Sequence, residues 1–227
     1  MKAGIIQSNF LPWRGYFDFI REVDLFILHD DLQYTKGDWR NRNKIKTPRG
    51  PEWITVSVRY RHTSQLIEET PIDNSKTWAR GMLNRIRDSY RKAPHFEPYF
   101  SELSELLLEP AASISYLNLR LIKWVCSHLE IKTPIHFSHQ YHPQGAKTER
   151  LIGILKQVGA TTYLSGLAAQ AYLQPELFEQ AGICLEYKLY DYPEYEQLYP
   201  PFEPAVSVID LLFMVGKDAG TYLDKTR

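Results

Sequence analysis

The first thirty residues carry the pattern that most restricts the fold: an apolar run, an amphipathic segment and a second apolar run. Residues 3–7 form the first run and residues 24–29 the second, which ends at the pair Asp30 and Asp31. Between them, residues 16–23 place their apolar side chains at helical spacing. Strand, short helix and strand in this order are typical of a parallel sheet with a right-handed crossover. The chain is therefore predicted to begin as a βαβ unit.

Strands and helices alternate again after about residue 130. Such alternation predicts an α/β fold with a mainly parallel, Rossmann-like sheet and helices on both faces. Residues 59–130 interrupt it with amphipathic segments, so we expect a helical insertion or cap within a single domain spanning 1–227. The other expected strands are 53–58, 134–138, 161–165 and 183–187, and the other expected helices are 78–90, 99–108, 116–129, 148–158 with Thr148 as N-cap, 168–172, 175–181 and 208–215.

The composition excludes several classes of protein. The 27 Lys and Arg residues equal the 27 Asp and Glu residues, which argues against a protein that coats nucleic acid, so no DNA partner is expected. No run of about eighteen apolar residues is present, which predicts no membrane insertion. The first apolar run ends too early for a signal peptide. Cys126 and Cys184 lie in apolar segments and are interpreted as buried thiols of a cytoplasmic protein.

The zero net charge hides two segments of opposite sign. Residues 33–49 contain six basic residues and one acid, and residues 174–204 contain seven acids and one lysine. The basic segment is either a solvated loop or a binding surface for a phosphate-bearing ligand, and we favour the second because aromatic and amide side chains are interleaved with the charges. The acidic segment is a solvated edge, a cover for the basic segment, or a surface for an amine-bearing or sugar ligand.

The fold rule for parallel sheets localises the candidate site. Ligands bind outside the carboxyl ends of the strands in open parallel sheets. Four polar segments follow expected strands, at 7–15, 30–42, 138–148 and 165–170. We expect these segments to converge on one crevice.

Each candidate residue has a chemical reason. Asp30 or Asp31 is expected to act as a general base, or to hold a ligand hydroxyl or a metal, and only one of the two need face the crevice because alternate side chains of an extended chain point to opposite sides. Cationic side chains bind phosphate, aromatic rings stack on the ligand, amides orient it, and small residues admit it. The residues expected to bind substrate or phosphate are Gln7, Asn9, Arg14, Gly15, Gln33, Tyr34, Lys36, Trp39, Arg40, Asn41, Arg42, Asn43, Ser165 and Gly166.

No metal site is predicted. His136, His139 and His142 recur at a spacing that matches neither a strand face nor paired zinc ligands, and no Cys or Glu partner accompanies them. Lys147 and Thr148 are similar to the end of a phosphate-binding P-loop, but the first glycine of that loop is missing. The sequence names no cofactor and leaves the oligomeric state open.

A longer motif passes through these segments. It runs Ile5-Ile6-Gln7-x-Asn9-Phe10-Leu11-Pro12-Trp13-x-Gly15-Tyr16-Phe17, then Asp30-Asp31-x-Gln33-Tyr34-x-Lys36-x-x-Trp39-x-Asn41-Arg42-Asn43, with Tyr163-Leu164-Ser165-Gly166 and Ser207-Val208-Ile209-Asp210-Leu211-Leu212-Phe213 further along. This motif resembles the WbqC-like protein family over nearly the whole chain. Met214-Val215-Gly216 stands where the family usually has an Asn.

The resemblance implies a role in surface polysaccharides. Family members occur in gene clusters for O-antigen and other polysaccharides, and glycine transfer has been suggested for one of them. The resemblance carries over no catalytic residue. Our leading hypothesis is a group transferase of O-antigen-type biosynthesis that acts on a nucleotide-linked or phosphate-bearing sugar, with aminoacyl (glycyl) transfer to an amino sugar as its specific form. The donor and the acceptor stay open.

Two alternatives stand beside this hypothesis. The first is a nucleotidylyltransferase-like enzyme, because the opening strand, loop and helix are similar in arrangement to those of pantothenate synthetase. Trp13-Arg14-Gly15-Tyr16 stands where those enzymes place His-x-Gly-His, which argues against adenylyl transfer. The second is a non-catalytic protein that binds a nucleotide or sugar nucleotide.

Overall fold

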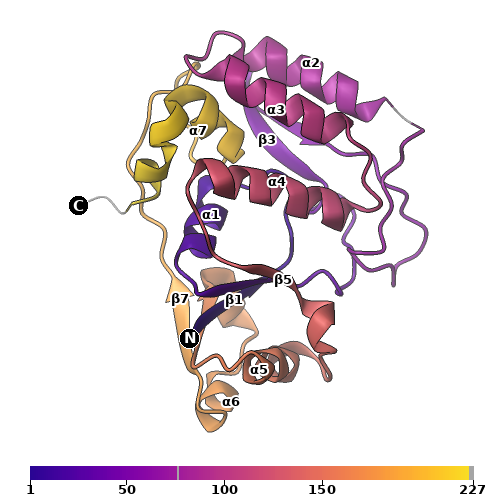
Figure 1. Cartoon of the computed structure of the whole chain (residues 1–227), viewed down its shortest axis with the longest axis vertical. Helices are drawn as coiled ribbons and strands as arrows, with labels where there is room; N and C mark the ends of the chain where they lie inside the picture. The colour runs from indigo at the N-terminus through magenta and orange to yellow at the C-terminus, as the bar shows by residue number, and fades with distance from the viewer. Residues whose placement is uncertain (76, 225–227) are drawn as a thin grey trace.

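The computed structural model describes residues 1–75 and 77–224 (Figure 1). Its centre is a five-stranded sheet with the strand order β5-β2-β1-β6-β7. Each neighbouring pair in this sheet is parallel, as predicted. The five strands are Lys2–Ile6 (β1), Leu25–Leu28 (β2), Ile135–Phe137 (β5), Thr162–Gly166 (β6) and Cys184–Lys188 (β7).

Helices cover both faces of the sheet, which confirms the predicted Rossmann-like α/β class. In Figure 1, α5 and α6 lie below the sheet and α4 lies above it. The α-helices of the described residues are Arg14–Arg21 (α1), Trp78–Tyr90 (α2), Phe96–Leu108 (α3), Ile114–His128 (α4), Lys147–Gln157 (α5), Pro175–Gln180 (α6) and Val208–Val215 (α7). Three 3₁₀ helices accompany them at Ser138–Tyr141 (η1), Leu167–Ala171 (η2) and Gly216–Leu223 (η3).

The buried strand β2 shows why the sheet has two covered faces. All four of its residues are buried, as is typical of a strand in a parallel sheet between helix layers. Phe26 and Leu28 belong to the hydrophobic cluster that includes α1, α4 and α7. Leu25 and Ile27 point to the opposite face and belong to the cluster that includes α5 and α6.

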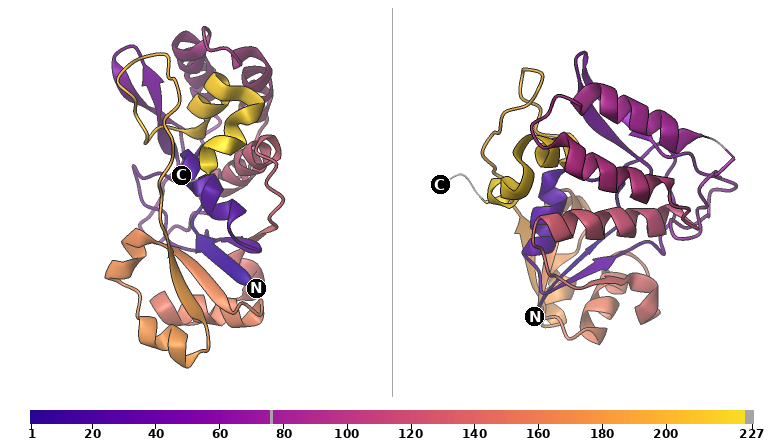
Figure 2. Two further views of the ribbon diagram at one scale, coloured as in Figure 1. Left: turned by 90° about the vertical axis from the view of Figure 1, so that its left-hand side faces the viewer. Right: turned by 45° about the horizontal axis from the view of Figure 1, so that its top comes forward.

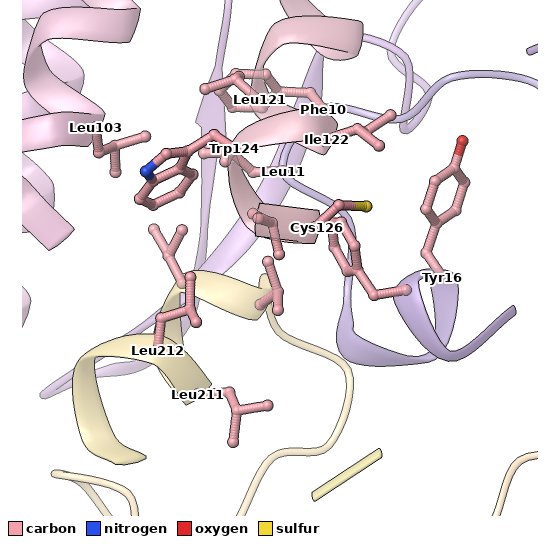
Figure 3. Packing of buried hydrophobic residues seen from close by; sticks show 14 of the residues in the cluster. Phe10, Leu11, Tyr16, Leu103, Leu121, Ile122, Trp124, Cys126, Leu211 and Leu212 are labelled. Atoms are coloured by element: carbon pink, nitrogen blue, oxygen red, sulfur yellow. The ribbon is translucent and has the colours of Figure 1, made fainter. Parts of the chain in front are cut away.

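The segment between β2 and β5 holds a hairpin and three helices. Arg42–Thr47 (β3) and Gly50–Thr55 (β4) pair antiparallel in a separate two-stranded sheet, and α2, α3 and α4 follow. Side chains of α3, α4, α7 and the β1–α1 loop share one hydrophobic cluster, which Figure 3 shows around Trp124 and Leu121. This segment therefore packs on the sheet through a common core, and Figure 2 shows the hairpin and these helices on the same side of it.

Three local predictions need correction. Residues 42–47, for which no strand was predicted, form strand β3: they pair with β4, and the charged groups of Arg42 and Lys44 lie over the Trp53 ring. Thr148 is not an N-cap: Ala146 holds that position, and the Thr148 hydroxyl accepts a hydrogen bond from the Gln174 backbone N–H. Cys184 is exposed at the start of edge strand β7, whereas Cys126 is buried as expected.

Among the described residues, no helix is long and apolar enough to cross a membrane. The C-terminal segment 189–207 instead runs along one side of the molecule from β7 to α7 (Figure 1). It reaches the basic hairpin, where the Lys46 ammonium donates to Gln197 Oε1 and to the Pro201 carbonyl. The segment therefore covers part of the basic surface with neutral oxygen atoms.

Candidate functional site

The order of the strands defines one special position in the sheet. From β1 the chain moves outward through β2 to β5, and it then crosses to β6 on the other side of β1. In doubly wound sheets, ligands bind at the carboxyl ends of the strands where the order reverses in this way. Here that position lies between the ends of β1 and β6.

A pocket of about 460 Å³ opens at this position, a size typical of small-molecule sites. We call it the switch-point pocket. All four polar segments singled out in the sequence contribute residues to it. Its lining consists of Ile5, Ile6, Gln7, His29, Leu32, Lys147, Arg150, Leu151, Tyr163, Ser165, Gly166, Ala168, Ala169 and Tyr172.

His29 and Arg150, which both line the switch-point pocket, form a cluster with Asp31. Arg150 Nη2 lies 2.5 Å from Asp31 Oδ2, and Arg150 Nε donates to His29 Nε2 over 3.3 Å. His29 Nε2 is also 3.7 Å from Asp31 Oδ1, which accepts a hydrogen bond from the Ser138 hydroxyl. Burial, aided by the Arg150 charge and opposed by Asp31, lowers the pKa of His29 to about 4. The imidazole is therefore neutral at physiological pH.

The N-terminus of α5 adds positive potential to the same pocket. Lys147 is the first residue of this helix and Arg150 lies one turn further along. The first N–H groups of a helix have no partner within the helix, and the helix dipole makes this end attractive to anions. Two cationic side chains and the helix end thus converge on the pocket, an arrangement that suits a phosphate group.

Asp30 faces away from this cluster. It is 0% exposed, and its carboxylate accepts hydrogen bonds from the Ser8 backbone N–H at 2.7 Å and from the Ser115 hydroxyl of α4. Burial raises the pKa of Asp30, although both hydrogen bonds oppose this effect. The two aspartates thus have different surroundings: Asp30 ties β2 to α4, and Asp31 joins the His29 and Arg150 cluster.

Arg40 contacts Gln7, one of the residues that line the switch-point pocket. Its Nη1 donates to Gln7 Oε1 at 2.7 Å, and its Nη2 lies 3.5 Å from Asp38. The Asn118 side chain donates to the Arg40 carbonyl at 2.9 Å, which fixes this part of the chain against α4. Because the side chain is buried, Arg40 orients Gln7 and does not itself line the pocket.

Three of the predicted residues line a different pocket. Asn9, Trp39 and Asn43 surround a space of about 300 Å³ together with Pro12, Trp13 and Ala205. We call this space the tryptophan pocket. It adjoins the switch-point pocket along the chain, because Gln7 lines one and Asn9 lines the other.

Arg14 and Gly15 lie outside the switch-point pocket, contrary to the expectation that they meet a phosphate there. Arg14 Nη1 donates to the Pro193 carbonyl at 2.8 Å, and its guanidinium lies over the rings of Tyr192 and Tyr195. A Cβ on Gly15 would lie 2.3 Å from the Trp13 ring. The glycine is therefore required by the packing of Trp13, and Arg14 fastens the C-terminal segment.

The remaining predicted residues have mainly structural contacts. Tyr34 is buried with its ring near Tyr60, so the ring is closed to a stacking ligand. The same burial raises the pKa of Tyr34 to about 12. The Asn41 side chain donates to the Val56 carbonyl, and Arg42 lies 4.1 Å over the Trp53 ring. Gln33 forms a β-bridge with Leu66, and Lys36 is exposed on the turn before β3.

Ser165 and Gly166 both line the switch-point pocket, as predicted for the fourth polar segment. The Ser165 hydroxyl lies 3.5 Å from the Tyr163 hydroxyl. Within the part of the chain that the structure describes, no atom outside its immediate chain neighbours lies within 4 Å of a Cβ built on Gly166, so this glycine leaves open space at the pocket.

Sequence reasoning singled out Lys147 but did not select two other polar residues of the pocket, His29 and Arg150. His29 immediately precedes the predicted aspartates at the end of β2, and its position after an apolar run is a signal that was available. Arg150 gave no such signal, because only the packing of α5 brings it to Asp31. Of the histidines considered for metal, His136 contacts the Tyr141 hydroxyl and His139 pairs with Glu68.

Comparison with known proteins agrees with the motif. The chain matches the WbqC-like protein family over residues 7–222. It is 45% identical over 225 residues to the uncharacterized protein Rv1507c of Mycobacterium tuberculosis, covering 98% of this chain and 97% of that protein. No solved structure matches. The protein belongs to the WbqC-like family.

Proposed function

We propose that the protein is a group transferase of surface-polysaccharide biosynthesis, whose substrate is a nucleotide-linked or phosphate-bearing sugar. One observation carries this proposal: the neutral imidazole of His29 lies beside Arg150 in the same pocket as Lys147, at the switch point of a Rossmann-like sheet. This combination pairs an anion-binding surface with a group able to accept a proton. The link to polysaccharides comes from what the resemblance to the WbqC-like family implies.

The phosphate of the substrate binds at the α5 end of the pocket. Lys147 is exposed and its charge reaches the pocket from the first helical residue. Arg150 is held by Asp31 and by the Pro143 carbonyl, so its guanidinium is already oriented when a ligand arrives. A preoriented cation loses less conformational entropy on binding than a mobile one. Lys147 thus attracts the phosphate by its charge, and Arg150 binds it with a guanidinium that is already oriented.

The specific form of the proposed reaction is aminoacyl transfer to an amino sugar. The amine nitrogen attacks the carbonyl carbon of an activated aminoacyl donor, an ester or a thioester. A carbon–nitrogen bond forms while the bond to the donor oxygen or sulfur breaks, and that atom leaves with the electron pair. His29 Nε2 accepts the proton released by the amine, exchanging for it the hydrogen bond that it otherwise accepts from Arg150 Nε. Asp31, 3.7 Å from His29 Nε2, stabilises the imidazolium that results.

Titration calorimetry with uridine diphosphate tests the binding half of the proposal. Lys147→Ala removes one exposed cation, and Lys156→Ala removes another at the far end of the same helix, about 14 Å away. We expect Lys147→Ala to weaken binding about tenfold, which corresponds to about 1.4 kcal/mol for one charge-assisted contact. Lys156→Ala should bind as the wild type does. Equal affinities for all three proteins, or no binding at all, would refute the phosphate site.

Turnover tests the catalytic half. Aminoacyl esters and thioesters are offered with uridine diphosphate glucosamine, and amide formation is followed by mass spectrometry. The proposal predicts a product with the wild type and a loss of about 10²–10⁴-fold in His29→Gln, the usual contribution of a general base. A product formed equally well by His29→Gln would remove the proposed role of this residue. Binding without any product across the panel would contradict the transferase.

A further inference from the structure

The tryptophan pocket has a different chemical character from the switch-point pocket. None of its six lining residues is charged, and two of them are tryptophans. The switch-point pocket, in contrast, is lined by Lys147, Arg150 and His29. A phosphate gains nothing from an uncharged, indole-lined space, so the two pockets suit different parts of a ligand.

We propose that the tryptophan pocket is a subsite for a neutral pyranose ring. An indole face is apolar and packs against the C–H face of a sugar, while the hydroxyls at the ring edge need hydrogen-bonding partners. The volume of about 300 Å³ lies at the lower end of small-molecule sites, which fits one ring and not a whole sugar nucleotide. The assignment of that sugar to the substrate rests on the proposed function.

Trp39 forms one wall of the subsite. Its side chain is 40% exposed, and its ring centroid lies 5.0 Å from that of Trp53 at a tilt of 48°. The backbone carbonyl of Trp39 accepts a hydrogen bond from the Phe10 N–H at 2.9 Å, which ties this residue to the β1–α1 loop. The Trp39 ring thus packs against Trp53 and remains partly open to solvent.

Trp13 is held just as firmly. Its ring packs edge-to-face with Tyr190 at 5.0 Å and with Tyr192 at 6.0 Å. Gly15 leaves the space into which the indole fits, since a Cβ there would overlap the ring. Glycine at this position therefore allows the Trp13 ring to pack where it lines the tryptophan pocket.

Asn9 provides an unused acceptor at the pocket. Its Oδ1 is buried and has no hydrogen-bond partner among the residues that the structure describes. A buried acceptor without a partner costs about 1–3 kcal/mol, so a turn of the Asn9 side chain that brings Oδ1 to a ligand hydroxyl recovers this energy. Asn43, by contrast, is fully occupied: its amide donates to the carbonyls of Phe10 and Leu11.

The β1–α1 loop is strained at Leu11. Leu11 has φ +41°, a left-handed conformation that is unfavourable for a leucine, and Asn43 holds its carbonyl at 2.7 Å. Strain of this kind persists where the surrounding structure fixes it and is concentrated at functional sites. Here the strained residue stands between Asn9 and Trp13, two of the residues that line the pocket.

Saturation-transfer NMR with methyl β-N-acetylglucosaminide tests the subsite directly. We expect transfer to the ring protons of the glycoside with the wild type, and at least a tenfold weaker affinity in Trp39→Ala and in Gly15→Ala. The matched control is Tyr116→Ala, which removes another exposed aromatic side chain from α4. Thermal melts of each variant establish that it is folded, and the two test variants alter different walls of the pocket.

The outcomes separate this inference from the proposed function. Glycoside binding that depends on Trp39 and Gly15 supports the subsite even if uridine diphosphate fails to bind. Uridine diphosphate binding without glycoside binding overturns the subsite and leaves the phosphate site intact. Equal glycoside signals in the wild type and Trp39→Ala, or displacement of the glycoside by uridine, would also overturn it.

Discussion

The buried neutral histidine makes a quantitative prediction about stability and pH. In the unfolded chain His29 has an ordinary pKa near 6.5, whereas in the folded protein burial lowers it to about 4. Between these two values the unfolded chain binds more protons than the folded protein. The free energy of unfolding is therefore fully maintained above pH 6.5 and falls as the pH falls towards 4.

The magnitude follows from the two pKa values. The difference between them corresponds to a loss of about 3 kcal/mol in the free energy of unfolding once His29 is protonated in both states. About 2 kcal/mol of this free energy is already lost at pH 5. His29→Gln removes the titrating group. Burial raises the pKa of Asp30 and Asp210, which act in the opposite direction, but both carboxyls are present in the wild type and in the variant. Their contributions therefore largely cancel in the difference.

Urea unfolding at pH 7, 6, 5 and 4 measures the effect. Between pH 7 and pH 5, the free energy of unfolding of the wild type should fall by about 2 kcal/mol more than that of His29→Gln. This difference should hold whatever the absolute stability of the variant at pH 7. His62→Gln, which changes an exposed histidine, should follow the wild-type curve. Parallel curves for the wild type and His29→Gln would show that His29 is not held neutral, and the argument for its role as a base would fail.

Two further predictions concern the core and the thiols. Tyr90→Phe removes a buried hydroxyl that donates to Asp210 and accepts from the Lys46 backbone N–H. In urea melts this variant should lower the free energy of unfolding by about 2–4 kcal/mol. Tyr60→Phe, at the surface, should change the free energy of unfolding by less than about 0.5 kcal/mol. Thiol labelling of the native protein should modify Cys184 rapidly and Cys126 only after unfolding, because burial raises the pKa of the Cys126 thiol to about 12; rapid labelling of both residues would contradict the described core.

Much of the fold was predictable because its signals are local. The helices at Trp78–Tyr90 and Val208–Val215 begin and end at the predicted residues, since each has a clear helical pattern between breakers. Strand β3 was missed because its residues are mostly polar, and its stability comes from pairing with β4 and stacking on Trp53. A strand of this kind has no apolar alternation to reveal it.

The candidate site was predictable in position but less so in composition. The rule for parallel sheets located the carboxyl ends of the strands, and Gln7, Ser165 and Gly166 line the pocket found there. Much of the charge of the basic segment stacks on Trp53 or is buried, as Arg42 and Arg40 show, and its role in phosphate binding stays a prediction. Arg150 and His29 are 121 residues apart in the sequence and meet only in the folded protein. No local sequence pattern encodes this contact.

The structure of the complex with uridine diphosphate tests the central claim most directly. A crystal structure of that complex should show the diphosphate within hydrogen-bonding distance of Lys147 and Arg150, between the ends of β1 and β6. Diphosphate density at another position, with the switch-point pocket filled only by solvent at saturating nucleotide, would contradict the account.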